Sequence, residues 1–163
     1  MSGFDNPLQT WNTRYGREDY HFGEAPNAFL RDHAHLLKAG QSALCVADGE
    51  GRNSVFLAER GVAVTAFDFS PIAVTKAQRL ASGRCVTVDY QVGDIYAWDW
   101  TAATYDAVVA IFIQFMSPGD RDAVFAGMKA AVKPGGLILL QGYRPEQIEY
   151  GTGGPPRREN MYT

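Results

Sequence analysis

Short apolar runs alternate with amphipathic stretches from residue 42 to residue 141, and this alternation limits the fold more than any other feature. The stretches between the runs repeat their apolar positions at helical spacing. Strands that alternate with helices build parallel sheets, because each helix carries the chain back to the same end of the sheet. The sequence therefore predicts an open, doubly wound, mostly parallel α/β sheet. Its five strands are expected at residues 42–47, 62–67, 86–92, 106–113 and 137–141.

Two Ser-Pro pairs mark the starts of helices. Ser70 and Ser117 can each cap a helix, and the proline that follows costs nothing in the first turn, where its missing N–H has no partner. Gly61 is placed to end the helix before the second strand. The helices are expected near residues 26–37, 53–60, 71–83 and 118–132.

Length and composition exclude several classes of protein. A chain of 163 residues forms one domain, and 46% apolar with 20% charged residues is not the composition of a disordered chain. A net charge of −3 disfavours a general nucleic-acid binder. Two cysteines, Cys45 and Cys85, and three histidines at these spacings predict neither a disulfide framework nor a metal site. Both cysteines are expected to be buried in a reducing cytosol.

The sequence carries no membrane signal. No apolar run approaches the length that a membrane span requires, and the N-terminus lacks the apolar stretch of a signal peptide. A cytoplasmic protein with no membrane partner is therefore expected.

Ligands of doubly wound sheets bind beyond the carboxyl ends of the strands. The first strand is followed by Asp48, and then by Gly49 and Gly51, which let the backbone turn tightly and approach a ligand. Asp68 ends the second strand 19 residues after Gly49, where a carboxylate can accept hydrogen bonds from a ribose. The alternatives are a plain strand-to-helix turn for the glycines and a helix cap for Asp68.

The third and fourth strands also end in residues that could contact a base. Asp94 can accept the amino group of an adenine, and Ile95 can pack on its ring, although a simple turn is the alternative. Ala110 and Ile111 could form an apolar floor for the base, and sheet core is their alternative.

The acid before the first glycine distinguishes two cofactors. A nicotinamide dinucleotide site favours a third small residue after the two glycines, where Ser54 stands here. Asp48 would repel a pyrophosphate, whereas it suits a cationic ammonium or sulfonium centre. This favours S-adenosylmethionine over NAD.

With these motifs the sequence resembles the class I S-adenosylmethionine-dependent methyltransferases, whose fold is a Rossmann-like doubly wound sheet. It is similar, more narrowly, to the branch of tellurite-resistance and thiopurine S-methyltransferase-like proteins, and the likeness covers nearly the whole chain. The motifs that carry the resemblance are residues 11–15, 22–27, 46–53, Asp68, 93–95, 133–136 and 142–156.

The resemblance implies S-adenosylmethionine as the cofactor and S-adenosylhomocysteine as its product. It implies one domain over residues 1–163, with a lid segment at 1–25, a cofactor-binding core at 26–142 and a C-terminal loop at 143–163. The aperiodic, aromatic and arginine-rich lid segment suits a cover better than a core, although an arm packed on the body or on a partner is the alternative. The cofactor-binding residues expected are Trp11, Arg14, Phe22, Asp48, Gly49, Gly51, Asn53, Asp68, Phe69, Ser70, Asp94, Ile95, Ala110 and Ile111.

Two departures from the family pattern follow. The family has seven strands and ends in an antiparallel hairpin, for which the chain to Thr163 leaves no room. The fifth strand would then be a sheet edge, which predicts a shortened chain, a clipped protein or a homodimer that covers the edge. Gln114 stands where relatives often carry a histidine, and glutamine cannot act as a base.

The expected activity is methyl transfer to a small-molecule acceptor with a soft sulfur, selenium or tellurium nucleophile. Sulfonium is already a good leaving group, so alignment is the main task, and a soft anion needs no strong base. No catalytic residue is assigned. The alternatives are a catalytically silent protein that binds S-adenosylmethionine or S-adenosylhomocysteine and an NAD(P)-dependent oxidoreductase.

Overall fold

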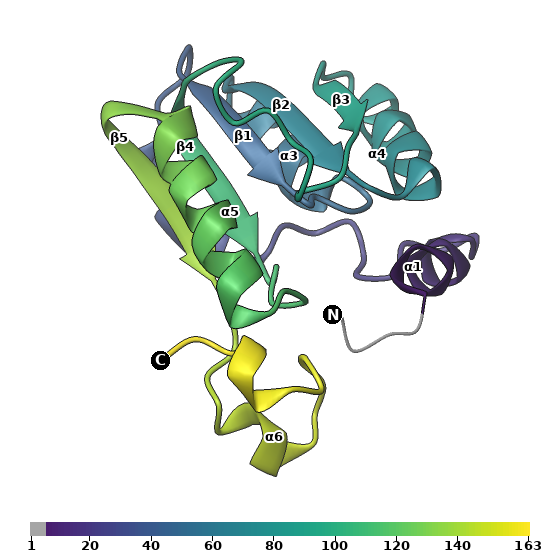
Figure 1. The fold of residues 1–163 in the computed structure, drawn as a ribbon. Coiled ribbons are helices and arrows are strands. Elements are labelled where there is room, and N and C mark those ends of the chain that lie inside the picture. Colours follow the sequence, from purple (N-terminus) through teal and green to yellow (C-terminus); the bar gives the residue numbers. More distant parts are fainter. Residues whose placement is uncertain (1–5) are drawn as a thin grey trace.

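The computed structural model describes residues 6–163, and its centre is a five-stranded sheet in the order β3-β2-β1-β4-β5 (Figure 1). All neighbouring strands are parallel, as predicted. The order reverses between β1 and β4, and this reversal is the point at which doubly wound sheets bind ligands. The strands are β1 (Ser42–Val46), β2 (Ala63–Asp68), β3 (Asp89–Val92), β4 (Tyr105–Ile111) and β5 (Val132–Gln141).

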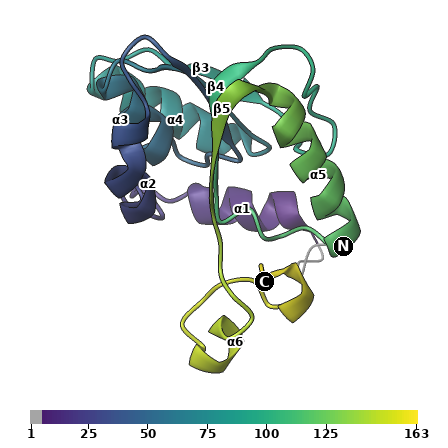
Figure 2. The same ribbon diagram turned by 90° about the vertical axis from the view of Figure 1, so that its left-hand side faces the viewer.

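Helices cover both faces of the sheet, as Figure 2 shows edge-on. On one face lie α2 (Ala28–His33) and α3 (Arg52–Glu59), with Leu30 and Leu57 fully buried against the strands. On the other face lies α5 (Pro118–Ala131), which buries Val124 and Met128. The helix α4 (Pro71–Gly83) contacts β2, β3 and α3.

Both predicted serine caps are confirmed. The hydroxyl oxygen of Ser70 accepts a hydrogen bond from the backbone N–H of Ala73, and that of Ser117 accepts one from Asp120. Each side chain satisfies one of the free N–H groups of a first helical turn, which fixes where α4 and α5 begin.

The segments at residues 6–16 and 142–163 lie beyond the carboxyl ends of the strands (Figure 1). Before the sheet comes α1 (Pro7–Tyr15), in a segment for which no helix was predicted. A 3-10 turn at Ala34–Leu36 lies between α2 and β1. After the sheet come a short α6 (Gln147–Tyr150) and a 3-10 turn at Arg158–Asn160. None of the helices within residues 6–163 has the length and apolar character that crossing a bilayer requires.

Three expectations about the elements are wrong. The third strand covers Asp89–Val92 rather than 86–92. Val86 packs against α3 and α4, and Val88 packs against the sheet core, without pairing with β2. Cys85 is exposed in the turn after α4, whereas Cys45 is buried as expected. The fifth strand begins at Val132 rather than at residue 137, with an irregular register beside Tyr105.

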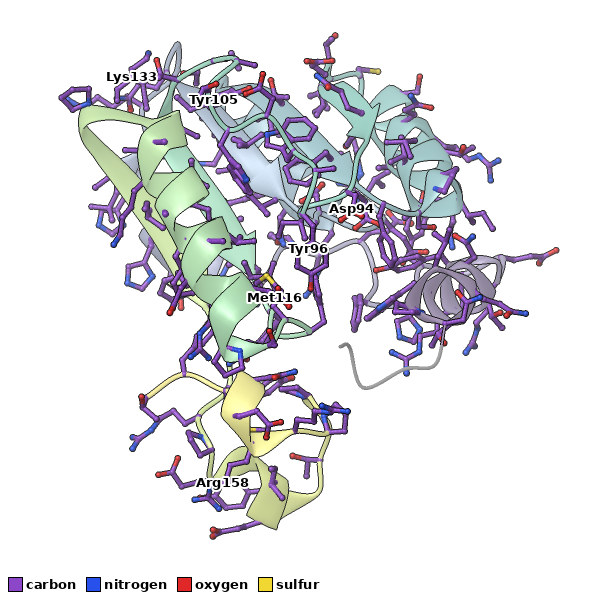
Figure 3. All side chains as sticks on the ribbon, in the orientation of Figure 1. Asp94, Tyr96, Tyr105, Met116, Lys133 and Arg158 are labelled. Carbon is purple, nitrogen blue, oxygen red and sulfur yellow. The ribbon has the colours of Figure 1, made fainter. Side chains whose placement is uncertain are left out.

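The connection from β3 to β4 contains no helix in the structure, and its aromatic rings cover the sheet instead. Trp98 stacks on Phe67 with their ring centroids 3.9 Å apart. Trp100 packs so closely on α5 that a Cβ at Gly127 would lie 2.5 Å from its ring. This connection brings Asp94 and Tyr96 to the carboxyl end of the sheet, opposite the end that holds Tyr105 and Lys133 (Figure 3).

Candidate functional site

The turn between β1 and α3 places a carboxylate beside two glycines. Gly49 and Gly51 have left-handed backbone, with φ of 61° and 89°, which favours glycine. The hydroxyl of Ser54 donates a hydrogen bond of 2.5 Å to the Asp48 carboxylate. Burial raises the pKa of Asp48 to about 7, and the neighbouring charge of Asp68 acts in the same direction. The site therefore holds a carboxylate that gains from a cationic partner.

Asp68 closes the adjacent strand and ties this turn to the next. Its two carboxylate oxygens accept hydrogen bonds from the backbone N–H groups of Gly49 and Ser70, both at 2.9 Å. Its side chain is almost fully buried, and burial raises its pKa to about 6 in spite of these donors. A carboxylate thus bridges the two loops at the strand ends and stays on a cavity wall.

Two cavities meet at the switch point. The first, of about 470 Å³, is lined by Asp48, Gly49 and Asp68 together with parts of both terminal segments. The second, of about 590 Å³, is lined by Asp94 and Ile95. Each is within the size range of small-molecule sites. They share the wall residues Trp11, Ala47, Phe69 and Phe115.

Rare backbone conformations mark the two central strand ends. Ala47 after β1 has φ of 48°, and Phe112 after β4 has φ of 58°. Residues other than glycine seldom adopt this region, and such residues gather at binding sites. Both line the first cavity, so a residue with positive φ follows each of the two strands, β1 and β4, that flank the switch point.

The helix α1 forms one wall of the first cavity. Tyr15 is buried, and its hydroxyl lies 3.0 Å from the position that a Cβ would take at Gly49. Trp11 stacks on Tyr15 with a centroid distance of 5.3 Å. Asn12 accepts a hydrogen bond of 2.5 Å from the Ser70 hydroxyl. Within the predicted lid segment, of which residues 1–5 lie outside the described residues, α1 therefore lies against the glycine turn.

A buried lysine of α4 holds the segment that follows α1. The Lys76 ammonium lies 2.5 Å from the Glu50 carboxylate, and both side chains are more than nine-tenths buried. It also donates to the backbone carbonyls of Tyr15, Arg17 and Asp19. The second Glu50 oxygen accepts the backbone N–H of His21 at 2.7 Å. We call this set, Lys76 and Glu50 with the carbonyls they anchor, the arm latch.

The opposite wall comes from the C-terminal segment. Gln114 is buried and brackets the Tyr143 backbone, donating to its carbonyl at 2.8 Å and accepting its N–H. The Tyr143 ring stacks on Phe112 at 4.6 Å. Gln114 thus positions the chain that leaves β5. A glutamine suits this role because its amide can both donate to and accept from one backbone unit.

Most of the predicted cofactor residues line one of the two cavities, and three do not. Gly51 faces α4, where a Cβ would lie 2.7 Å from that of Ala77. Ser70 is fully buried as the cap of α4, and Ala110 is buried in the sheet core. The expected residues that lie on the walls are Trp11, Arg14, Phe22, Asp48, Gly49, Asn53, Asp68, Phe69, Asp94, Ile95 and Ile111.

The cavity walls also contain residues that were not assigned to a site from the sequence. His21 lies on the wall of the first cavity, and burial lowers the pKa of its imidazole. Arg52, the first residue of α3, lies on the same wall and donates to the Phe22 carbonyl at 3.2 Å. Its place directly after the glycine turn is the one signal in the sequence that could have marked it. Tyr143 lies within the motif at residues 142–156 but was given no role there, and no motif marks Asn160.

Comparisons with known proteins place this arrangement in a class. The profile of the family described as "Methyltransferase domain" matches residues 43–136. Phosphoethanolamine N-methyltransferase 1 from Triticum aestivum is 32% identical over 112 residues, which are 66% of this chain and 22% of that protein. The chain thus spans about a fifth of the length of this curated relative.

Solved structures agree on the fold. The N-methyltransferase NodS from Bradyrhizobium japonicum WM9, in complex with S-adenosyl-L-homocysteine, aligns with a TM-score of 0.71 at 20% identity. The alignment covers 93% of this chain and 80% of that one. TehB from Haemophilus influenzae aligns with a TM-score of 0.63 at 20% identity, over 80% of this chain and 44% of that one.

The parallel sheet and its switch-point cavities define a Rossmann-like α/β domain of the class I methyltransferase type. The match over residues 43–136 assigns the chain to a family as well as to a fold, since it covers more than half of the sequence. The chain belongs to the methyltransferase domain family.

Proposed function

We propose that this domain binds S-adenosylmethionine and transfers its methyl group to a small-molecule acceptor. The observation that carries the proposal is the pair of buried carboxylates, Asp48 and Asp68, at neighbouring strand ends on one cavity wall. Two acids at this point suit a zwitterionic cofactor with a sulfonium centre and oppose a pyrophosphate. Membership of the methyltransferase domain family supports the same conclusion.

We propose that the cofactor extends across both cavities. Its methionine part would lie at Asp48 and Gly49. The Asp68 carboxylate accepts backbone N–H groups on both oxygens and keeps lone-pair capacity for a ribose hydroxyl. Phe69 lines both cavities and would lie against the adenine, with Asp94 and Ile95 at its far side.

The reaction is an in-line displacement that depends on alignment. Bound S-adenosylmethionine supplies an electrophilic methyl group, to which the acceptor forms a bond while the carbon–sulfur bond breaks and sulfur keeps the electron pair. The chain's own task is to hold the two reactants in line and exclude water. The walls from α1 and from the C-terminal segment are placed to do this.

A soft nucleophile is the acceptor that we favour. A reduced sulfur, selenium or tellurium anion attacks without a strong base. Gln114 cannot supply one, because a carboxamide is not basic, and both ends of this amide are bound to the Tyr143 backbone. The structural likeness to TehB is compatible with the tellurite-resistance branch. A cytoplasmic location fits the two free thiols of Cys45 and Cys85.

A calorimetric titration with S-adenosylhomocysteine tests the cofactor. We expect one site per chain, and we expect Asp68→Ala to weaken binding by a factor of about 100, in line with the loss of a charge-assisted hydrogen-bond pair. Exposed Asp99→Ala is the matched control and should bind normally. Unchanged affinity in Asp68→Ala would sink the ribose assignment.

Turnover separates the proposed enzyme from its alternative. Product formation with thiols or tellurite is expected when the domain is supplied with S-adenosylmethionine. Binding without turnover on such a panel would indicate a silent cofactor-binding protein. Affinity for NADH without affinity for S-adenosylhomocysteine would indicate an oxidoreductase.

We also propose that two copies pair along β5. This strand lies at the edge of the sheet, and Ile138 on it is exposed. An uncovered apolar edge strand favours pairing with another copy.

A further inference from the structure

A buried serine of α3 bonds the carboxylate that follows β1. Ser54 is the third residue of α3, and none of its surface is exposed. Its hydroxyl oxygen lies 2.5 Å from Asp48 Oδ2, 3.1 Å from the Gly51 carbonyl oxygen and 2.9 Å from the Tyr90 hydroxyl oxygen. Asp48 lines the first cavity, whereas Ser54 and Tyr90 line neither of the two cavities.

Counting protons fixes the direction of these hydrogen bonds when Asp48 is ionised. A hydroxyl has one proton to donate, and carboxylate and carbonyl oxygens can only accept. The Asp48 carboxylate is the nearest acceptor and carries the charge, so it takes the Ser54 proton. The Ser54 oxygen then accepts the proton of Tyr90, whose hydroxyl stays protonated because burial raises its pKa. We call these bonds, from Tyr90 through Ser54 to Asp48, the hydroxyl relay.

The glycine at position 51 leaves the space that the hydroxyl relay occupies. A Cβ at Gly51 would lie 2.8 Å from the Tyr90 hydroxyl oxygen. Tyr90 belongs to β3, which β2 separates from β1 in the sheet. The relay therefore joins three parts of the chain, the turn after β1, the first turn of α3 and β3, at one carboxylate.

The groups around Asp48 divide into those that favour its charge and those that oppose it. Burial and then the Asp68 carboxylate raise its pKa to about 7. The Ser54 hydroxyl is the largest influence in the other direction, followed by the Ser54 backbone N–H and the Arg52 guanidinium. The other titratable groups that interact with Asp48 are kept neutral by burial, which raises the pKa of each, and they are Tyr15 of α1, Cys45 of β1 and Tyr90 of β3.

We propose that Ser54 and Tyr90 are positioning residues for the cofactor, and that the hydroxyl relay keeps the Asp48 carboxylate charged and oriented for the cofactor ammonium group. A hydrogen bond to the charged form of an acid favours ionisation, and a chain of such bonds strengthens its last member. The two residues act through Asp48, since neither lies on a cavity wall. The inference rests on the function proposed above, because the ammonium group is that of S-adenosylmethionine.

The pH dependence of S-adenosylhomocysteine binding separates this role from a merely structural one. Calorimetry on the full chain is repeated from about pH 6 to about pH 8.5. Ser54→Ala removes the donor to the charged carboxylate, so the midpoint of the affinity profile should rise by about one pH unit. Affinity should fall about tenfold at the acid end and by less than about threefold at the alkaline end. A loss of equal size at every pH would overturn the proposal.

Tyr90→Phe tests the outer member of the hydroxyl relay, because it keeps the ring and removes only the hydroxyl. A smaller rise of the midpoint, roughly a third of a pH unit, is expected, since Tyr90 acts on Asp48 only through Ser54. In the double variant Ser54→Ala, Tyr90→Phe, the loss of the Tyr90 hydroxyl should add nothing. Shifts that add up in the double variant would contradict the relay.

Tyr105→Phe is the matched control for the loss of a tyrosine hydroxyl. Tyr105 lies at the opposite end of the sheet from the site (Figure 3). The midpoint of the affinity profile in this variant should be that of the wild type. A midpoint that rises as much in Tyr105→Phe as in Tyr90→Phe would show that the shift does not report on contact with Ser54.

A titration without ligand distinguishes failure of the hydroxyl relay from failure of the proposed function. The carboxyl carbon resonance of Asp48, identified by its loss in Asp48→Asn, gives the midpoint in the free chain. If the wild type does not bind S-adenosylhomocysteine, the proposed function fails, and this resonance still shows whether Ser54→Ala raises the midpoint of Asp48. An unshifted Asp48 resonance midpoint in Ser54→Ala would overturn the relay, whether or not the cofactor binds.

Discussion

Two buried carboxylates dominate the site at the scale of single residues. Asp48 and Asp68 have pKa values raised to about 7 and about 6, and burial is the larger cause for both. An acid in this state keeps its proton at a pH where a solvated acid has lost it. A cationic ligand reverses that balance, because it stabilises the charged form.

The affinity for S-adenosylhomocysteine should therefore depend on pH. Binding of the ammonium group needs Asp48 ionised, so a proton leaves when the ligand binds below the pKa of about 7. We expect the affinity to rise by up to about tenfold per pH unit below that pKa, and to level off above it. Titrations in two buffers with different ionisation enthalpies measure the released proton.

Asp48→Asn is the control for this pH dependence. It should bind more weakly and release fewer protons near pH 7, since the amide at position 48 does not titrate and only Asp68 is left to do so. An affinity that falls as the pH rises from about 6 to about 8 would contradict the expected linkage.

At the scale of elements, one glycine sets how closely α3 and α4 approach. Gly51→Ala would place a Cβ 2.7 Å from that of Ala77 and 2.8 Å from the Tyr90 hydroxyl, on a backbone with φ of 89°. We expect a loss of about 2–4 kcal/mol in the free energy of unfolding, from crowding and backbone strain together. Urea unfolding measures it.

Gly83→Ala is a matched control for this substitution. Gly83 ends α4 with open space around its Cβ position and no positive φ. There the methyl group should stabilise the fold by about 0.5 kcal/mol, because alanine loses less entropy on folding. If Gly51→Ala and Gly83→Ala changed the free energy of unfolding equally, the close approach of α3 and α4 would not be the reason for a glycine at position 51.

The arm latch joins the N-terminal segment to α4. Lys76→Met would leave Glu50 buried without its cation, and breaking such a pair costs about 3–5 kcal/mol. The carbonyls of Tyr15, Arg17 and Asp19 would lose their donor as well. We expect faster tryptic cleavage after Arg17 and weaker binding of S-adenosylhomocysteine.

The double variant Lys76→Met, Glu50→Gln separates charge from anchoring. It should recover part of the stability, because no buried charge is left alone. The three carbonyls still lack their donor, so cleavage after Arg17 should stay fast. Slow cleavage in Lys76→Met would mean that the latch does not hold the arm.

At the scale of the whole molecule, the open side of the sheet bears on assembly. The strand order leaves β5 at an edge, with Ile138 37% exposed. If two copies pair there, sedimentation at micromolar concentration should show a dimer, and Ile138→Lys should shift it to monomer. Exposed Ile148→Lys, on α6 and away from that edge, should leave the dimer intact. A wild-type monomer would contradict edge pairing.

Local signals predicted most of the sheet and missed the ends of the chain. The β4 run is continuous and apolar, and most of β4 is buried between β1 and β5, as expected from that run. The Ser-Pro caps fixed the starts of α4 and α5 because a cap acts over three residues. The helix α1 escaped prediction because distant contacts help to determine it: buried Tyr15 lies against the glycine turn, and α1 packs on α4.

The candidate site divides in the same way. Asp48, Gly49 and Asp68 follow strands, and parallel strands bring their carboxyl ends to one edge, so spacing along the chain was enough to find them. Gly51 and Ser70 belong to the same motifs but face the helices, a difference that depends on the packing of α3 and α4. Arg52, Gln114, Tyr143 and Asn160 reach the cavity from separate segments.

The sequence by itself determined the class of fold, the edge of the sheet that carries the site and the two acids on it. Each of these depends on periodicity or on contacts between near neighbours, which a linear pattern records. The tertiary structure alone decided that Lys76 holds the arm, that Gln114 positions Tyr143 and that Asn160 lies buried on the cavity wall. Those contacts join residues far apart in the chain, and their partners are set only when the whole core has packed.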